Sequence, residues 1–66
     1  MNALQLRKRH GMKQADFWAR IGVSQSGGCR YESGRRIPRP VLLLIDIAYG
    51  NEKARTRALK ALQPKQ

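Results

Sequence analysis

The stretch that decides the fold is QADFWARIGVSQSGGCRYESG, residues 14–34. It contains two short helical patterns, joined by a three-residue turn that opens on Gly22. The second pattern starts with small polar side chains and is followed by an arginine cluster. A short helix with polar side chains at its leading end and arginines beside it is suited to enter a DNA groove. Two consecutive glycines inside that helix are unexpected, because glycine disfavours helix interiors.

Charge is the decisive bulk property. The 66 residues include 14 Lys and Arg against 4 Asp and Glu, a net charge of +10. Such a charge density attracts polyanions whatever the fold, and we take nucleic acid as the favoured partner. Charge alone leaves open a generic solubilising surface and a nonspecific RNA or membrane binder. The length predicts one domain over residues 1–66, near the lower limit for a single hydrophobic core.

The sequence argues against several classes of protein. The single cysteine, Cys29, leaves no internal disulfide, and beside the single histidine, His10, it offers no zinc-ligand spacing. The N-terminus has no apolar run of signal-peptide length, and the most apolar segment, residues 41–45, is too short to cross a membrane. We therefore expect a cytoplasmic protein without cofactor or metal. Since no nucleophile–base pair or carboxylate dyad is visible, we expect no enzyme activity.

Helix signals mark the first half of the chain. Asn2 is a candidate N-cap for a first helix, and Gly11 stands where its C-terminus needs a left-handed residue. A second helix is predicted over residues 14–21. Ser24 is a good N-cap for a third helix over residues 25–33.

Helix signals continue after the opening stretch. Residues 35–39 are predicted to form a loop, and Pro40 suits the first turn of a fourth helix over residues 41–49. That segment is apolar nearly all round, so it should be the buried centre of the fold. Asn51 is a candidate cap for a fifth helix that reaches residue 62. Because no β-strand alternation appears, the predicted fold class is all-α, a compact bundle of about five short helices.

The chain resembles the phage-repressor family of helix-turn-helix DNA-binding domains, the Xre or Cro/repressor type. The resemblance covers residues 2–50 and implies a lambda-repressor-like bundle, with the motif at residues 14–34 and the recognition helix, residues 25–33, in the major groove. It depends on a set of positions that occur in order with the right lengths between them: Leu6, Arg7, Gly11, Gln14, Phe17, Gly22, Val23, Ser24, Arg30, Tyr31, Glu32, Gly34, Arg35, Arg36 and Pro38.

Candidate DNA contacts follow from residue chemistry and from this resemblance. Gln25 can bind an adenine edge through its paired donor and acceptor, and Ser26 can bond to several base edges. Arg30 can reach a guanine edge or a phosphate, and both readings stay open. Phosphate contacts set the register of a protein on DNA without reading its sequence. The implied phosphate contacts are Gln14, Ser24, Arg35, Arg36 and Arg39.

Two further pairs of residues are expected to be structural. The family pairs an arginine of its first helix with a glutamate at the end of the recognition helix, and Arg7 and Glu32 occupy these positions. Elsewhere the chain departs from the family, which usually has alanine where Trp18 stands and isoleucine or valine where Gly28 stands. We expect the ring of Trp18 to fill the volume that Gly28 leaves, which keeps the packing dense.

These features predict a sequence-specific, double-stranded DNA-binding regulator of transcription, phage- or plasmid-related by resemblance. Such domains commonly bind as dimers on half-sites about one helical turn apart. An apolar stripe on the fifth helix, which includes Leu59 and Leu62, is either a candidate homodimer surface or the closure of the small core. One alternative is an antitoxin or restriction-control protein of the same fold, with a toxin or another regulator as partner. Another is a nonspecific nucleic-acid-coating module.

Overall fold

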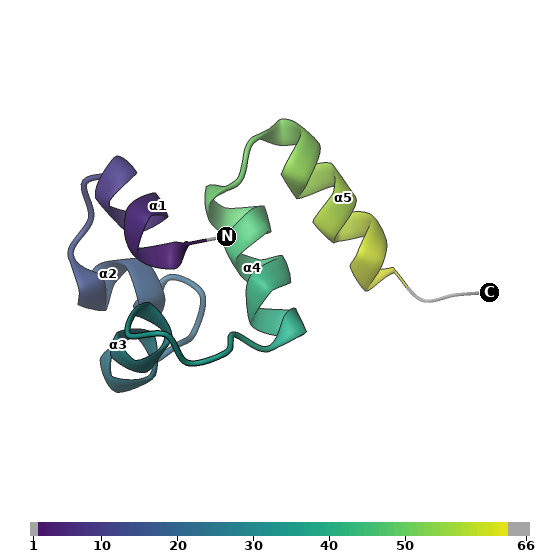
Figure 1. The fold of residues 1–66 in the computed structure, drawn as a ribbon. Coiled ribbons are helices and arrows are strands. Elements are labelled where there is room, and N and C mark those ends of the chain that lie inside the picture. The colour runs from purple at the N-terminus through teal and green to yellow at the C-terminus, as the bar shows by residue number, and fades with distance from the viewer. Residues whose placement is uncertain (1, 64–66) are drawn as a thin grey trace.

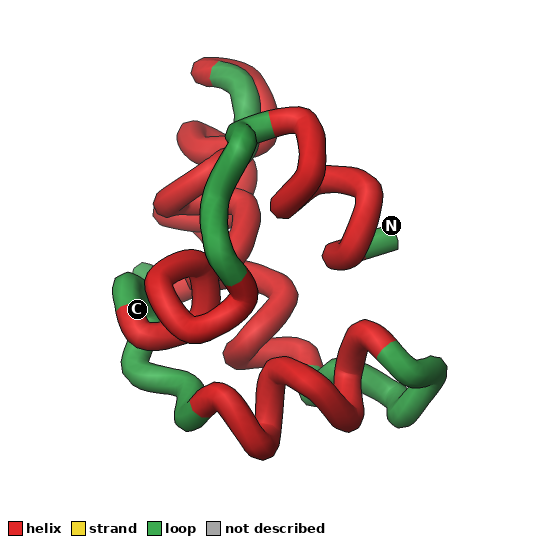
Figure 2. Tube along the Cα trace, turned by 90° about the vertical axis from the view of Figure 1, so that its left-hand side faces the viewer, coloured by secondary structure: helices red, strands yellow, loops and turns green. Residues whose placement is uncertain are grey.

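The computed structural model describes residues 2–63, and within them the chain is helical with no strand. Figure 1 shows the order of the helices and Figure 2 the same chain turned by 90°. This arrangement confirms the predicted all-α class. None of the helices in the described range is long and apolar enough to cross a membrane. The helices are α1 (Ala3–Arg9), α2 (Gln14–Ala19), α3 (Gln25–Glu32), α4 (Arg39–Tyr49) and α5 (Glu52–Leu62).

Polar caps and one left-handed glycine set the boundaries that matter for the motif. Asn2, Ser24 and Asn51 each precede a helix, and each side chain accepts a hydrogen bond from the backbone N–H three residues later, at 2.8–3.2 Å. These bonds satisfy donors that the first turn of a helix leaves unpaired. Gly22 has a φ of +80°, a left-handed conformation that reverses the chain between α2 and α3.

Three predicted boundaries are wrong. α3 ends at Glu32, one residue before its predicted end. α2 ends at Ala19, two residues before the predicted end, because the chain already turns there towards Gly22. α4 begins at Arg39, so this arginine belongs to the first turn of a helix and not to the preceding loop. Pro40 then lies within the first turn of α4, where its missing N–H costs no hydrogen bond.

The centre of the core lies between α2 and α4. Phe17, Trp18 and Ile45 are fully buried, and Tyr49 is 5% exposed. The rings of Phe17 and Tyr49 stack at 4.1 Å between centroids, and the Tyr49 hydroxyl donates a 2.6 Å hydrogen bond to the Phe17 carbonyl oxygen. Burial raises the pKa of Tyr49, and Arg20 offsets the increase only in part. These contacts anchor α2, the first helix of the motif, on α4.

α4 is not the fully buried centre that its composition predicts. Ile45 and Tyr49 are its buried residues, whereas Leu44 is 39% exposed. The reason is visible in Figure 1: α1–α3 lie on one side of α4 and α5 on another, and this small bundle supplies no further element to cover the rest. α5 is held through Ala58, which is buried, while Leu59 and Leu62 remain about half exposed.

Candidate nucleic-acid interface

One side of α3 is open to solvent and the opposite side is packed. Gln25, Ser26, Cys29 and Arg30 are exposed, whereas Gly28 is buried. A helix turns by about 100° per residue, so these four exposed residues occupy one continuous arc. The three predicted base contacts therefore share a single face of the second motif helix.

The exposed face of α3 continues onto the start of α2. Gln14 lines one shallow groove together with Gln25, Ser26, Cys29 and Arg30. The structure thus brings a predicted phosphate contact, from the first motif helix, next to the predicted base contacts. Cys29 also lies in this groove with its thiol exposed, a position that the sequence analysis did not assign to the interface. Its spacing of four residues from Gln25 was the signal that could have placed it there.

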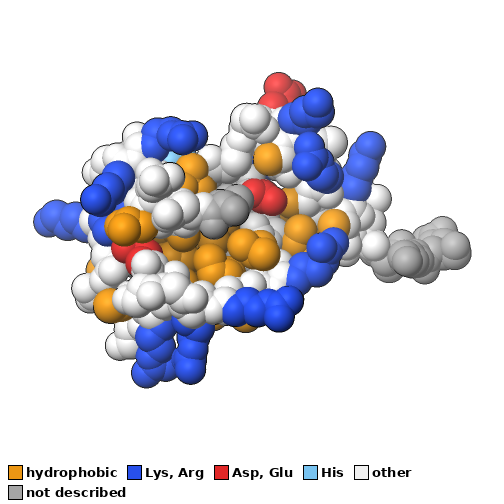
Figure 3. All heavy atoms as spheres, in the orientation of Figure 1, with side chains coloured by type: hydrophobic (Ala, Val, Ile, Leu, Met, Phe, Trp, Pro, Cys, Tyr) orange, Lys and Arg blue, Asp and Glu red, His pale blue; other side chains and the backbone are white. Residues whose placement is uncertain are grey.

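Three arginines follow α3 and all are exposed. Arg35 and Arg36 lie in the loop, which runs from α3 to the start of α4 in Figure 1, and Arg39 opens α4. In Figure 3, Lys and Arg side chains gather beneath α3 and along the neighbouring lower edge of the molecule. Cations beside an exposed recognition face are suited to hold phosphates on either side of the bases being read.

The packed side of α3 ends in a polar cluster centred on Glu32. Arg7 donates two hydrogen bonds to the Glu32 carboxylate, from Nε and Nη2, both at 2.9 Å. Trp18 Nε1 donates a third at 2.7 Å, and Gln14 Nε2 a fourth at 3.2 Å. The side chains of Arg7 and Glu32 are only 18% and 6% exposed. One carboxylate thus links α3 to both α1 and α2.

The electrostatics of Glu32 follow from these contacts. Burial by itself would raise the pKa of the carboxyl group. The hydrogen bonds from Arg7, Trp18 and Gln14, together with the positive charge of Arg7, outweigh burial, so the pKa lies below its ordinary value of 4.5. Glu32 therefore stays ionised near neutral pH, and its charge orients the end of α3.

Trp18 and Gly28 meet at the contact between the two motif helices. Both residues are buried, and a Cβ atom on Gly28 would overlap Cδ1 and Cγ of the indole ring. No residue larger than glycine fits there while the ring keeps its place. The structure thus places a large side chain on α2 against the bare backbone of α3, at the two positions where the sequence departs from the repressor pattern.

The hydrogen bond from Trp18 to Glu32 is a contact that the sequence analysis missed. The two residues are 14 positions apart and lie on different helices, so no helical periodicity links them. Gln14 is half-buried, and its amide nitrogen donates to Glu32, as the resemblance to the repressor family implies for a glutamine that braces the recognition helix. This contact braces α3, and the phosphate contact of Gln14 stays a prediction.

The family comparison agrees with this architecture. The family model described as "RsaL-like HTH domain" matches residues 4–48. The chain belongs to this helix-turn-helix family. The match runs from α1 through most of α4, so it includes the whole α2–turn–α3 unit, while α5 lies outside it. No curated protein and no solved structure matched the chain. Membership of this helix-turn-helix family indicates a role in DNA binding. The narrower resemblance to phage repressors stays a prediction.

Proposed function

We propose that this protein is a sequence-specific regulator of transcription that binds double-stranded DNA with α3 in the major groove. The observation that carries the proposal is the exposed face of α3, where Gln25, Ser26 and Arg30 stand together. The opposite face is fixed by the Gly28 contact and the Glu32 cluster. A helix held on one side and polar on the other presents base-reading groups in a fixed geometry.

Phosphate contacts would position this helix. The exposed arginines Arg35, Arg36 and Arg39 come directly after α3, where they can clamp the backbone beside the groove. Gln14 and Ser24, at the starts of the two motif helices, complete the proposed set. We further propose a bacterial, phage-repressor-type regulator that acts in the cytoplasm without enzyme activity, as the resemblance implies.

Selection of bound sequences from random double-stranded DNA tests this proposal. We expect a defined consensus, and binding to it should survive a large excess of random DNA. Specific binding typically exceeds nonspecific binding by about 10³-fold or more at physiological salt. If no consensus emerges and random DNA removes all binding, the protein is a coating module instead.

The α4–α5 surface supports the proposed homodimer. Leu44, Leu59 and Leu62 are the exposed large hydrophobic residues of the described chain, and all three lie on these two helices. A second copy covering them would remove apolar surface from water. Sedimentation of the wild type and of Leu62→Lys tests this: we expect a dimer that the substitution dissociates, and a selected site with two half-sites. A wild-type monomer with a single asymmetric site would contradict it and favour a different protein partner.

A further inference from the structure

α5 carries a basic surface that the family match does not account for. The helix has four cations, Lys53, Arg55, Arg57 and Lys60, against one acid, Glu52, and it lies outside the matched residues 4–48. At about 100° per residue, Lys53, Arg57 and Lys60 fall within an arc of about 60°. Arg55 points to nearly the opposite side, towards the flank with the exposed leucines.

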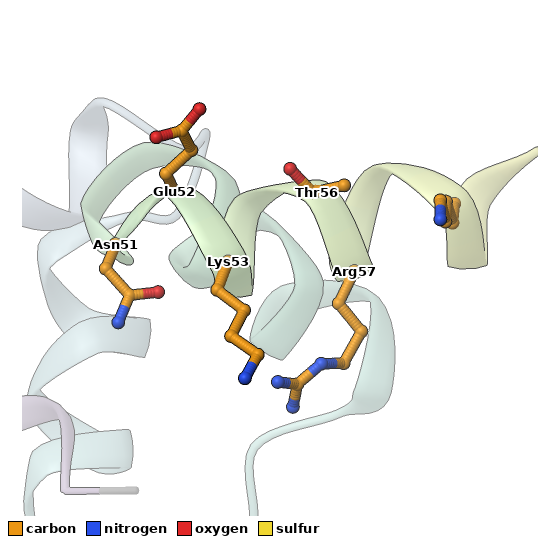
Figure 4. Close-up of a pocket in the computed structure, with 6 residues that line it drawn as sticks. Asn51, Glu52, Lys53, Thr56 and Arg57 are labelled. Carbon is orange, nitrogen blue, oxygen red and sulfur yellow. The ribbon is translucent and has the colours of Figure 1, made fainter.

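We call the three cations Lys53, Arg57 and Lys60 the α5 basic strip. They are exposed and line one shallow surface groove, together with Glu52. In Figure 4, Lys53 and Arg57 extend to the same side of α5, whereas Glu52 points the other way. The ion pair found in the described residues is Arg7–Glu32, so the strip holds its charge without an acidic partner there. Unpaired, aligned cations of this kind are suited to bind phosphates.

The helix that carries the strip reaches the proposed DNA interface. α5 runs back along α4, so its C-terminal half lies beside the start of α4, where Arg39 stands (Figure 1). In Figure 3, blue side chains follow the edge of the molecule from beneath α3, past the start of α4, to α5. The molecule extends 37 Å along its longest axis, about one turn of B-DNA.

We propose that the α5 basic strip is a second phosphate-binding surface, which contacts the backbone of the same duplex that α3 reads. This inference rests on the proposed function, because the duplex is placed by α3. The α3–loop surface reads and clamps the half-site, and the strip extends the contact along the backbone next to it, on the side of the half-site where α5 lies. The strip adds affinity that depends on salt and not on sequence.

Two single substitutions on the same helix provide a matched test. Arg57→Ala and Arg55→Ala remove the same charge two residues apart, one on the strip and one off it. Binding to the selected duplex with about 10 flanking base pairs on each side is measured from 50 to 200 mM salt. The salt slope is the decrease of the logarithm of the binding constant with the logarithm of the salt concentration, and losing one phosphate contact lowers it by about 0.9. The ratio of the wild-type binding constant to that of Arg57→Ala should therefore fall about 3.5-fold from 50 to 200 mM salt. Compared at protein concentrations at which sedimentation shows the same oligomeric state for both variants, Arg55→Ala should leave the slope unchanged.

Equal effects of the two substitutions, or no effect of either, would overturn the proposal. On a single half-site trimmed at both ends to the base pairs that α3 contacts, the Arg57→Ala defect should disappear. If the defect persists there, the strip does not hold the backbone next to the half-site. The same conclusion follows if the wild type captures a second labelled duplex and Arg57→Ala does not. The consensus from random DNA and the effect of Gln25→Ala on it do not depend on the strip. They therefore separate a failure of this inference from a failure of the proposed function.

Discussion

The indole ring of Trp18 packs directly on the backbone of Gly28, and its N–H donates to Glu32 four residues further along α3. A single side chain of the first motif helix therefore contacts the recognition helix in two ways, by ring packing and by a hydrogen bond. Small residues at helix crossings let two backbones approach closely; here glycine instead admits a large ring. Both contacts hold α3 against α2.

Gly28→Ala should destabilise the protein, although alanine favours a helix by about 1 kcal/mol over glycine. The new methyl group would overlap the indole ring, and such overpacking typically costs about 1–3 kcal/mol. Gly27→Ala is the matched control, since its Cβ would lie 3.2 Å from Val23 Cγ1 and 3.3 Å from Ser24 Oγ, atoms of side chains that can adjust. Urea unfolding followed by circular dichroism should rank Gly28→Ala as the less stable variant.

A double-mutant cycle measures the coupling between the large side chain at position 18 and the missing side chain at position 28. Gly28→Ile and Trp18→Ala should each destabilise the protein, and the double variant should recover part of the loss, with a coupling energy of about 1 kcal/mol or more. A Gly28→Ile variant that gains stability while the Trp18 ring stays in place would refute the account of this contact.

Acid should weaken the protein through Glu32. Its pKa is lowered in the folded state, so its contribution to stability is complete above the ordinary value of 4.5 and is lost as the pH falls through the lower folded-state value. Glu32→Gln should remove this component of the pH profile. It should also cost about 3 kcal/mol near neutral pH, because it leaves the guanidinium of Arg7 unpaired. Unfolding curves from pH 7 to pH 3 check both expectations, and parallel wild-type and variant profiles would contradict them.

The main elements could be predicted because local chemistry determines them. Asn2, Ser24 and Asn51 cap helices where the sequence places them, and Gly22 turns the chain between the motif helices. The non-local parts could not be predicted from periodicity. The Trp18–Glu32 hydrogen bond joins residues on two helices, and the exposure of α4 depends on how few elements surround it. The start of α4 at Arg39 could not be predicted either. Pro40 fits the first turn of a helix, but it does not determine which residue before it begins that helix.

Cys29 provides a probe of the interface that requires no substitution, because it is the single cysteine of the chain and its thiol is exposed on α3. The selected duplex should slow maleimide alkylation of this thiol at least about tenfold, since major-groove docking covers this face. The control carries Cys29→Ser and Gln5→Cys, which moves the thiol to an exposed position on α1, outside the proposed DNA contacts. Equal alkylation of Cys29 with and without the duplex would place the DNA elsewhere.

Arg36→Ala should weaken binding to all sequences alike and lower the salt slope by about one, as expected for a lost phosphate contact. Arg55→Ala removes the same charge from the far flank of α5 and controls for the net charge of the protein. Binding isotherms at several salt concentrations on selected and random duplexes provide the comparison. If the salt slope of Arg36→Ala equals that of Arg55→Ala, Arg36 does not contact a phosphate.

The central claim is that α3 reads bases, and Gln25→Ala tests it most directly. Its affinity should be measured on the selected site and on every single-base variant of that site. We expect a loss of about 1–3 kcal/mol on the selected site and relaxed base preference at one position of each half-site, with the other positions unchanged. A uniform loss across all variants, with every base preference retained, would show that Gln25 touches only the backbone and would contradict the claim.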